Sequence, residues 1–415
     1  MTESFDVAIV GGGVIGVATA DLLAARGARV VLLERGEVAS GASYGNAGWI
    51  SPSHGTPLPA PGVIGQALRW LLDPESPFYV KPRLDLALAR WLLGFLRAST
   101  AARARATLRA NRELILASLE RYAKLAGEGL EFGFAPHGLV VACESDDGLA
   151  KARHELELIR ANGGEGAPLS ADELRARVPR VAASLRGGVW FPQDAHLDPA
   201  RLVRGLAARA AARGASIATG QEVLGFELDG RRIARIVATR GDFRADQVVL
   251  AAGAWSPALA TQLGLRIPVQ AAKGYSVLVR RPADFADVPV LLSEAKVAVT
   301  PLGDALRFAG TLELAGVDLS VNARRVGAIL RAVDRFIPGL RAGERLETWR
   351  GLRPLTPDDR PILGRPRALA NLIVATGHGM SGISMGPISA QLVAELCAGE
   401  PPSLPLDPFA PDRFA

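Results

Sequence analysis

The chain has 415 residues, of which 49% are hydrophobic and 22% charged, values typical of a folded globular protein that exclude extensive disorder. The formal net charge is +6, but the basic residues lack the interleaved stacking aromatics of a nucleic-acid module, so we expect no nucleic-acid partner. Cys143 and Cys397 are far apart and lack metal-ligand spacing, which excludes a disulfide framework and indicates no metal site.

The first predicted element is a short apolar strand that runs directly into a glycine-rich turn. The turn reads Gly11-x-Gly13-x-x-Gly16, apolar residues then recur at helical spacing, and a second apolar run ends at Glu34. Gly11 permits the tight turn, Gly13 lets the backbone approach a pyrophosphate, and Gly16 lets the helix pack against the strand. Glu34 would accept a hydrogen bond from a ribose hydroxyl. The pattern predicts a βαβ unit that binds an ADP-containing cofactor, without saying which one.

The next segment is a run of small residues, 40–50, which would let the backbone lie close to a flat group. A proline-dense loop, 51–62, follows it. Hydrophobic periodicity then predicts amphipathic helices at 63–72 and 84–99 and a longer Arg/Ala-rich helix at 101–126.

The middle of the chain carries no dinucleotide signature of its own. Alternation over 130–142 around Pro136-His137-Gly138 predicts a β-hairpin, and helices are expected at 145–161 and 170–178, the second opened by the capping box Ser170-x-x-Glu173. We interpret this region as an inserted domain of antiparallel strands and covering helices.

The remaining elements return to the first domain and then complete the second. A helix is expected at 198–213, and Asp229-Gly230 is a hairpin turn between two strands. Further strands are expected at 215–219, 224–228, 233–239, 247–252, 272–280, 288–301 and 306–311, with helices at 322–336 and 383–398. The last helix follows a strand and a glycine cluster, which repeats the opening arrangement and offers a second helix N-terminus.

Five motifs together resemble the D-amino-acid oxidase-like FAD-dependent oxidoreductase family, in its bacterial D-amino-acid dehydrogenase and D-hydroxyproline dehydrogenase branch. They are Val10-Gly-Gly-Gly-Val-Ile-Gly16, Tyr44-Gly-Asn46-Ala-Gly48, Ala272-Lys-Gly-Tyr275-Ser, Gly351-Leu-Arg353-Pro-Leu-Thr-Pro-Asp-Asp359-Arg-Pro and Thr376-Gly-His378-Gly. The resemblance implies an α/β fold, in which a Rossmann-like FAD-binding domain is interrupted by a substrate domain with a mostly antiparallel sheet and covering helices. We expect the FAD-binding domain at 1–50, 195–265 and 345–415, and the substrate-binding domain at 51–194 and 266–344.

The resemblance also implies FAD contacts in several segments. The implied residues are Gly11, Gly13, Val14, Ile15, Gly16, Glu34, Arg35, Gly41, Ala42, Ser43, Asn46, Ala47, Gly48, Trp49, Ile50, Val223, Ala252, Gly253, Trp255, Gly377, His378, Gly379, Met380, Ser381 and Gly382. Neither cysteine lies in a motif that resembles the family's attachment sites, so we expect the FAD to be non-covalent.

Amino-acid oxidation requires the substrate Cα–H to be aimed at flavin N5, and the substrate carboxylate is the natural handle. Arg353 matches the family position for this clamp. Arginine suits the task because its planar guanidinium forms two parallel charge-assisted hydrogen bonds with a carboxylate. A structural ion pair of Arg353 with Asp358 or Asp359 is the alternative.

Three further side chains are candidates for the same site. Tyr275 could add a second contact to the substrate carboxylate. The alternative is that Tyr275 is simply an aromatic strand residue packed in the sheet, which is nearly as good an interpretation. His54 and His378 could help to deprotonate the substrate ammonium. The alternatives are a loop-stabilising His54 and a His378 that only contacts the flavin.

The sequence thus predicts an FAD-dependent dehydrogenase of D-amino acids, with D-proline and D-hydroxyproline among the candidates and a quinone or other carrier as electron acceptor. The alternatives are an O₂-using glycine, sarcosine or D-amino-acid oxidase, a pyridine-nucleotide dehydrogenase and a flavin-bearing structural subunit. We expect a cytoplasmic protein without signal peptide or spanning helix. The Arg-rich amphipathic stretch 84–112 could rest on the inner membrane face, although a solvent-facing or subunit-packing helix is the simpler interpretation. The sequence indicates no oligomeric state.

Overall fold

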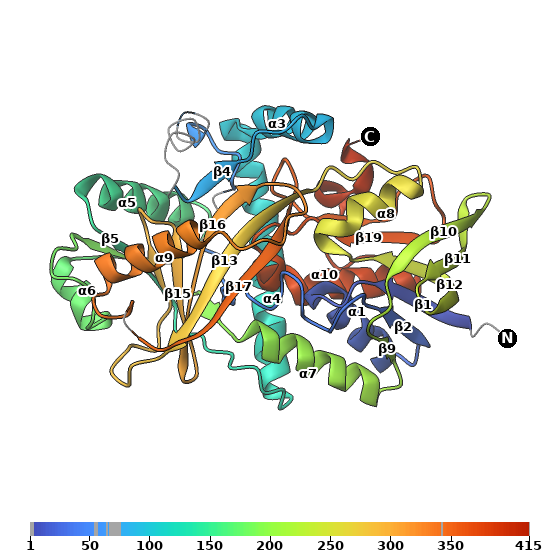
Figure 1. Ribbon diagram of the computed structural model, residues 1–415, viewed down its shortest axis with the longest axis horizontal. Coiled ribbons are helices and arrows are strands. Elements are labelled where there is room, and N and C mark those ends of the chain that lie inside the picture. Colours follow the sequence, from blue (N-terminus) through green and yellow to red (C-terminus); the bar gives the residue numbers. More distant parts are fainter. Residues whose placement is uncertain (1–3, 54–56, 64, 66–75, 342, 415) are drawn as a thin grey trace.

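The structure is a computed structural model in which residues 4–53, 57–63, 65, 76–341 and 343–414 are described. Two lobes, each built around a β-sheet, lie side by side, and the long helix α4 (Ala101–Gly127) runs along the boundary between them (Figure 1). Parallel strands with crossing helices in one lobe and a mostly antiparallel sheet in the other confirm the predicted α/β fold class.

The sheet of the first lobe has the strand order β10-β11-β12-β1-β2-β9, with β19 beside β12 and β18 beside β19. The pairs of β1 with β2, β1 with β12, β2 with β9 and β12 with β19 are parallel, so the predicted βαβ unit is confirmed. The strands are β1 (Ser4–Val10), β2 (Val30–Leu33), β9 (Ser216–Ala218), β10 (Val223–Asp229), β11 (Arg232–Ala238), β12 (Gly241–Leu250), β18 (Ile362–Gly364) and β19 (Leu372–Thr376).

Helices cover both faces of this sheet. On one face α1 (Val14–Ala25), α7 (Pro199–Ala212) and α10 (Gly382–Ala398) share a hydrophobic core with β1 and β2. On the other face α8 (Ser256–Gln262) packs against the opposite side chains of the same strands. Because both faces are buried, β2 is apolar throughout rather than alternating. The short 3₁₀ helices are η1 (Gly253–Trp255), η2 (Asp407–Phe409) and η3 (Pro411–Phe414).

The sheet of the second lobe has the order β17-β13-β16-β15-β14-β5-β7-β6, with β4 beside β16. Its pairs are antiparallel except for β14 with β5 and β16 with β4. The strands are β4 (Phe78–Val80), β5 (Leu139–Cys143), β6 (Ala167–Leu169), β7 (Gly187–Phe191), β13 (Gln270–Arg280), β14 (Val290–Leu292), β15 (Val297–Leu302), β16 (Ala305–Leu314) and β17 (Arg345–Leu355). Helices α6 (Ala171–Arg177) and α9 (Ala323–Phe336) cover one face and α5 (Asp146–Arg160) the other.

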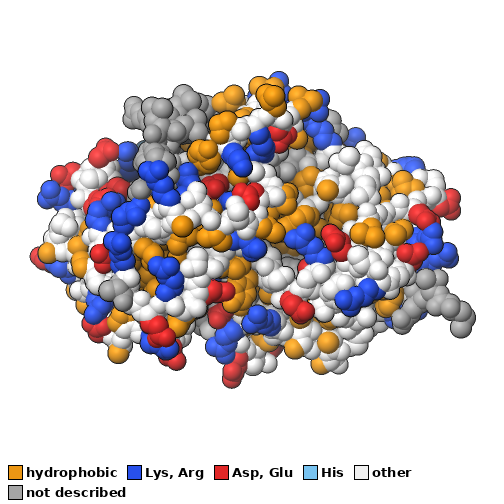
Figure 2. Space-filling view, in the orientation of Figure 1, with side chains coloured by type: hydrophobic (Ala, Val, Ile, Leu, Met, Phe, Trp, Pro, Cys, Tyr) orange, Lys and Arg blue, Asp and Glu red, His pale blue; other side chains and the backbone are white. Residues whose placement is uncertain are grey.

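Helix α3 (Leu86–Ala98) lies on the outside, next to the start of α4 (Figure 1). It buries Leu88 and Trp91 in a small core, whereas a group of its apolar side chains stays in solvent. In Figure 2, apolar side chains with Lys and Arg beside them lie on the surface where Figure 1 shows α3. The exposed apolar residues there are Leu84, Leu86, Leu93 and Leu96. Among the helices that the structure describes, none combines the length and apolar character that crossing a bilayer requires.

Several element predictions hold and some are wrong. The capping box is present, with Ser170 accepting from the Glu173 N–H and Glu173 accepting from the Ser170 N–H. The hairpin predicted at 130–142 is absent, since of these residues only 139–142 belong to a strand, β5. Ala135 instead bridges His196 on the short strand β8 (Ala195–His196), which itself pairs with β3 (Trp49–Ile50). Most of the helix predicted at 63–72 lies outside the described residues.

The predicted domain division stays a proposal. One strand, β17, belongs to the sheet of the other lobe than the division predicted. The prediction assigned residues 345–415 to the FAD-binding domain, but β17 pairs along its length with β13 of the second sheet. Hydrogen bonding between strands far apart in sequence, which no local pattern specifies, decides this assignment.

Candidate functional site

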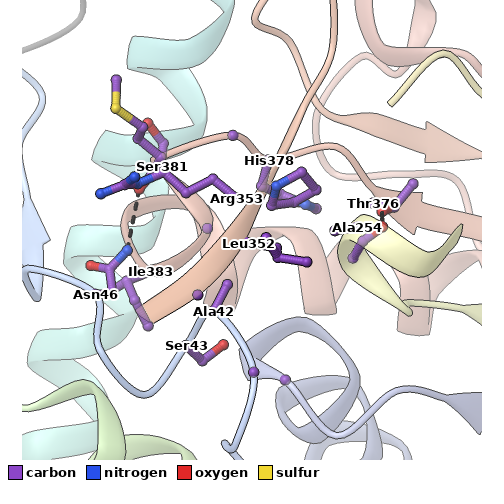
Figure 3. A pocket seen from close by; sticks show the side chains of 18 of the residues that line it. Ala42, Ser43, Asn46, Ala254, Leu352, Arg353, Thr376, His378, Ser381 and Ile383 are labelled. Atoms are coloured by element: carbon purple, nitrogen blue, oxygen red, sulfur yellow. Dashed lines mark hydrogen bonds between the residues drawn. The ribbon is translucent and has the colours of Figure 1, made fainter. Parts of the chain in front are cut away.

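A cavity of about 1410 Å³ lies between the two lobes and is lined by residues of both (Figure 3). Gly11 and Glu34 of the first lobe line one part of it, and Arg353 of β17 lines another. The cavity therefore follows the edge of the parallel sheet where the strands end, where α/β sheets bind ligands.

The glycine turn after β1 is built for close backbone contacts. Gly11 has φ of 117°, and a Cβ there would lie 2.5 Å from the Ala251 carbonyl oxygen. A Cβ at Gly16 would lie 2.0 Å from the Gly11 carbonyl oxygen, so Gly16 is required for packing the helix on the turn. Gly13 precedes α1 without a side-chain cap, and although the Val14 N–H donates to Ser43 Oγ at 3.0 Å, the rest of the helix N-terminus faces the cavity and suits an anion.

Glu34, at the end of β2, is held rigidly at the cavity wall. Its Oε2 accepts a hydrogen bond from the Gly12 N–H at 2.7 Å and its Oε1 one from the Gly36 N–H at 2.8 Å. Because each carboxylate oxygen can accept more than one hydrogen bond, the group retains capacity for a hydroxyl. Beside it the guanidinium of Arg35 lies 3.7 Å from the centre of the Trp255 ring.

The small-residue loop 40–50 is fixed by contacts with both lobes. Asn46 donates to the Met380 carbonyl at 3.3 Å, and its Oδ1 accepts from the Gly48 N–H at 2.8 Å (Figure 3). Arg307, 4% exposed on β16, donates to the carbonyls of Tyr44 and Asn46 at 3.0 and 2.9 Å. Such a loop presents a firm backbone wall to a planar group.

Arg353 projects from β17 into the cavity (Figure 3). Its Nη1 donates to the Thr311 carbonyl at 2.8 Å, and burial lowers the pKa of the guanidinium to about 10, so it remains a cation at neutral pH. The alternative ion pair is not formed: Asp358 pairs with Arg413 at 2.9 Å, and Asp359 Oδ2 accepts from the Leu58 N–H at 3.0 Å. Among the described residues, no carboxylate forms an ion pair with Arg353, so its charge is available to an anion in the cavity.

The two predicted histidines have different outcomes. His378 lines the cavity, its Nε2 lies 3.0 Å from Ser389 Oγ, and burial lowers the pKa of the imidazole to about 3. It is therefore neutral and weakly basic at pH 7, which argues against its suggested part in deprotonating the substrate. A contact with the flavin stays a prediction. His54 lies outside the described residues.

Tyr275 lies on the wrong face of β13 for a substrate contact. Side chains alternate along a strand, and a Cβ at Gly274 would meet Arg353 at the cavity, so Tyr275 points to the opposite face. There it is 1% exposed in the core against α9, and its hydroxyl accepts from the Asn322 N–H at 3.3 Å. The alternative of a packed strand aromatic fits this position, and Tyr275 is absent from the described cavity lining.

Most residues expected to contact FAD line the cavity, and four do not. The four are Gly16, Gly48, Ile50 and Gly377, of which Ile50 is fully buried in the core of the first lobe. Lining residues that the sequence did not single out include Gln221, Thr311 and Trp349. They reach the cavity through turns and strand pairing, and no local pattern marks them.

These residues fit an FAD molecule. The glycine turn and helix N-terminus suit a pyrophosphate, Glu34 suits a ribose, and the firm loop 40–50 with the segment 378–382 suits the flat ring. A Cβ at Gly45 would lie 2.0 Å from the Trp349 indole of β17, which shows how closely this loop packs against the second sheet.

Comparison with known proteins agrees with this geometry. The family model "FAD dependent oxidoreductase" matches residues 6–396. A D-amino acid dehydrogenase of Paramagnetospirillum magneticum is 36% identical, with 98% of each chain covered. A D-amino-acid oxidase of Bradyrhizobium diazoefficiens is 32% identical, with 100% of each covered.

Solved structures agree as well. The crystal structure of glycine oxidase from Geobacillus kaustophilus has a TM-score of 0.78 and 28% identity, with 99% of each chain covered. The predicted resemblance and the FAD cofactor are both confirmed. The chain belongs to the family of FAD-dependent oxidoreductases.

Proposed function

We propose that this protein is an FAD-dependent dehydrogenase that oxidises D-amino acids to the corresponding imino acids. The observation that carries the proposal is Arg353, a half-buried cation at the cavity wall for which the described chain supplies no carboxylate. The names of full-length relatives, among them the 36% identical D-amino acid dehydrogenase, support the same reaction.

The residues of the cavity have separate tasks in this reaction. Bound FAD supplies the hydride acceptor. Arg353 binds the substrate carboxylate through two parallel hydrogen bonds, which fixes the direction in which the Cα–H points. The apolar side chains of Leu352 and Ile383 line other parts of the cavity and exclude water there.

Electron transfer to a quinone or other carrier is part of the proposal, and the outside of α3 is the candidate contact with a membrane. Leu86, Leu93 and Leu96 are exposed there, with Arg90 and Arg97 on the same short helix. Apolar side chains flanked by arginines suit an anionic bilayer surface. Flotation with phosphatidylglycerol vesicles tests this: wild type should float, whereas Leu93→Glu combined with Leu96→Glu should stay in solution. Equal flotation would remove α3 from the contact.

A direct oxidase reaction with O₂ is the second candidate. The 32% identical D-amino-acid oxidase and the 28% identical glycine oxidase favour it, since both relatives are named as oxidases. The two candidates differ in one product. Hydrogen peroxide at the rate of substrate consumption would identify an oxidase, and dye reduction without peroxide a dehydrogenase.

The deciding experiment is an anaerobic flavin-bleaching screen of the purified yellow protein. The panel contains D- and L-amino acids, N-methyl amino acids, D-proline and D-hydroxyproline. D-amino acids should bleach the flavin absorbance, and the cyclic compounds decide whether they belong to the substrate class. If no member bleaches the flavin, the proposed function is wrong and a structural flavin subunit is favoured. Acid precipitation of the same sample should release the FAD into the supernatant, as a non-covalent cofactor requires.

A further inference from the structure

Asp359 lies in the turn between β17 and β18 with an unusual backbone conformation. Its φ is 57°, in the left-handed region that residues other than glycine rarely adopt. Such residues persist where the surroundings fix them, and they are enriched at functional sites. Asp359 also lines the cavity, together with Arg353 and His378.

Contacts from three segments hold this aspartate in place. Asn111 of α4 donates to its backbone carbonyl at 2.8 Å, and Leu58 N–H donates to its Oδ2 at 3.0 Å. Its other oxygen, Oδ1, would lie 3.2 Å from a Cβ at Gly379, immediately after His378. Among the residues with described positions, none donates a hydrogen bond to Oδ1. Within the described part of the chain, one oxygen is therefore anchored and the second is left for a ligand.

The charges around Asp359 leave its carboxyl near its titration point at neutral pH. Burial, which outweighs the opposing hydrogen bond from the Leu58 N–H and is assisted by the neighbouring Asp358 carboxylate, raises the pKa of Asp359 to about 7. Asp358 is itself paired with Arg413 and Arg360. Among the described residues, the other groups bonded to Asp359 are uncharged at pH 7, namely the Asn111 amide on α4 and the Leu58 backbone, and the neutral His378 lines the same cavity. Arg353, near the end of β17, is a cation that lines the same cavity.

The proposed reaction needs a group of this kind. An amino acid enters as a zwitterion, and its nitrogen must lose a proton before the Cα–H can leave as hydride. His378 is too weakly basic, and Glu34 lies at the glycine turn with both oxygens bound to backbone N–H groups. A carboxylate that titrates near neutral pH and lines the same cavity as the clamp can accept this proton.

We infer that Asp359 is the catalytic base that holds the substrate amino group through Oδ1 and receives its proton, while Arg353 holds the carboxylate. In this step one N–H bond of the ammonium breaks, its electron pair stays on nitrogen, and an O–H bond forms on Oδ1. The proton passes to solvent after the product leaves. The inference rests on the proposed function.

Asp359→Asn and Asp359→Gly test it, because asparagine is isosteric and glycine adopts φ of 57° without strain. The measurement is the rate of anaerobic flavin bleaching from pH 5.5 to 9 with the best amino acid of the screen. The wild-type rate should rise about tenfold per pH unit below the pKa and level above it, while both variants should be about 10²-fold slower at pH 8 without that inflection. Added acetate should partly restore the glycine variant.

A binding measurement separates this role from a structural one. The compound 2-aminoisobutyrate has a carboxylate and an ammonium but no Cα–H, and isobutyrate lacks the amino group. The amino group should strengthen binding to the wild-type holoenzyme by about tenfold at pH 8 and hardly at all in Asp359→Asn. Flavin absorbance serves as the readout.

Each outcome decides one of the two claims. Variants with the wild-type rate, the wild-type inflection and the same preference for 2-aminoisobutyrate would remove Asp359 from the reaction. A wild-type protein that no amino acid bleaches would overturn the proposed function itself.

Discussion

The guanidinium of Arg353 lies directly over the backbone of Gly274 on the adjacent strand. A Cβ at position 274 would be 1.8 Å from Arg353 Nη1. Strand pairing places Ala272 opposite Arg353 and Gly274 opposite Gly351, so the arginine side chain crosses β13 to reach the Thr311 carbonyl on β16. The missing side chain at 274 is what allows the arginine to lie along the cavity wall.

Gly274→Ala should therefore impair catalysis while leaving the fold intact. The added methyl group displaces a flexible guanidinium rather than backbone, so we expect kcat/KM to fall by about 10- to 10²-fold with unchanged flavin content. Gly127→Ala is the matched control, since a Cβ there meets nothing within 4 Å at the end of α4. Steady-state kinetics of both variants check the prediction, and equal values for Gly274→Ala and wild type would contradict it.

Arg353→Ala removes the clamp itself. The lost charge-assisted contact is worth about 1.5 to 3 kcal/mol, and lost alignment adds to it, so kcat/KM should fall by about 10² or more. Arg353→Lys keeps the charge without the fork and should recover only part of the loss. Both variants should retain FAD, as judged by the absorbance spectrum. Wild-type turnover in Arg353→Ala would remove this residue from the site.

Gly11→Ala should lower the affinity for FAD. The new Cβ would lie 2.5 Å from the Ala251 carbonyl oxygen, and the φ of residue 11 is 117°, which an alanine rarely adopts. The backbone of the turn must therefore shift. We expect the purified variant to contain less flavin per chain than wild type. Gly264→Ala is the control, because it also has a positive φ, 69°, but open space around it. Full flavin content in Gly11→Ala would show that the turn tolerates a side chain.

His196 should make the fold sensitive to acid. Burial, assisted by the nearby His137, lowers the pKa of His196 to about 4. The unfolded chain, with a pKa of about 6.5, binds the proton more readily, so this residue lowers stability as the pH falls from 6.5 towards 4.

Between pH 7 and pH 5, one such histidine lowers the free energy of unfolding by on the order of 2 kcal/mol. His196→Gln should therefore lose less unfolding free energy than wild type over that interval, by about this amount. Urea denaturation at both pH values measures it. An identical loss in wild type and variant would show that His196 does not contribute.

The elements that the sequence predicted correctly are those whose signals are local. The strand, glycine turn and helix at residues 4–25 follow from apolar spacing and from glycines at fixed offsets, and the helix start at Ala171 follows from its capping box. The hairpin at 130–142 failed because Ala135 pairs with His196, some sixty positions away. A strand pattern records the preference of a segment and not its partner.

The sequence by itself predicted an ADP-containing cofactor at Gly11 and Gly13, and the family resemblance singled out Arg353 as the candidate carboxylate clamp. The cofactor prediction needs only residue type and spacing, since backbone N–H groups at a helix start bind an anion in any fold. The clamp prediction also needs the family motif, which places a planar guanidinium where a carboxylate would bind. Tertiary structure alone decided that Tyr275 faces the core, that His378 is a weak base, and that Asp359 reaches the cavity. Each depends on strand register or on burial by segments distant in sequence, and both arise only when the whole chain is folded.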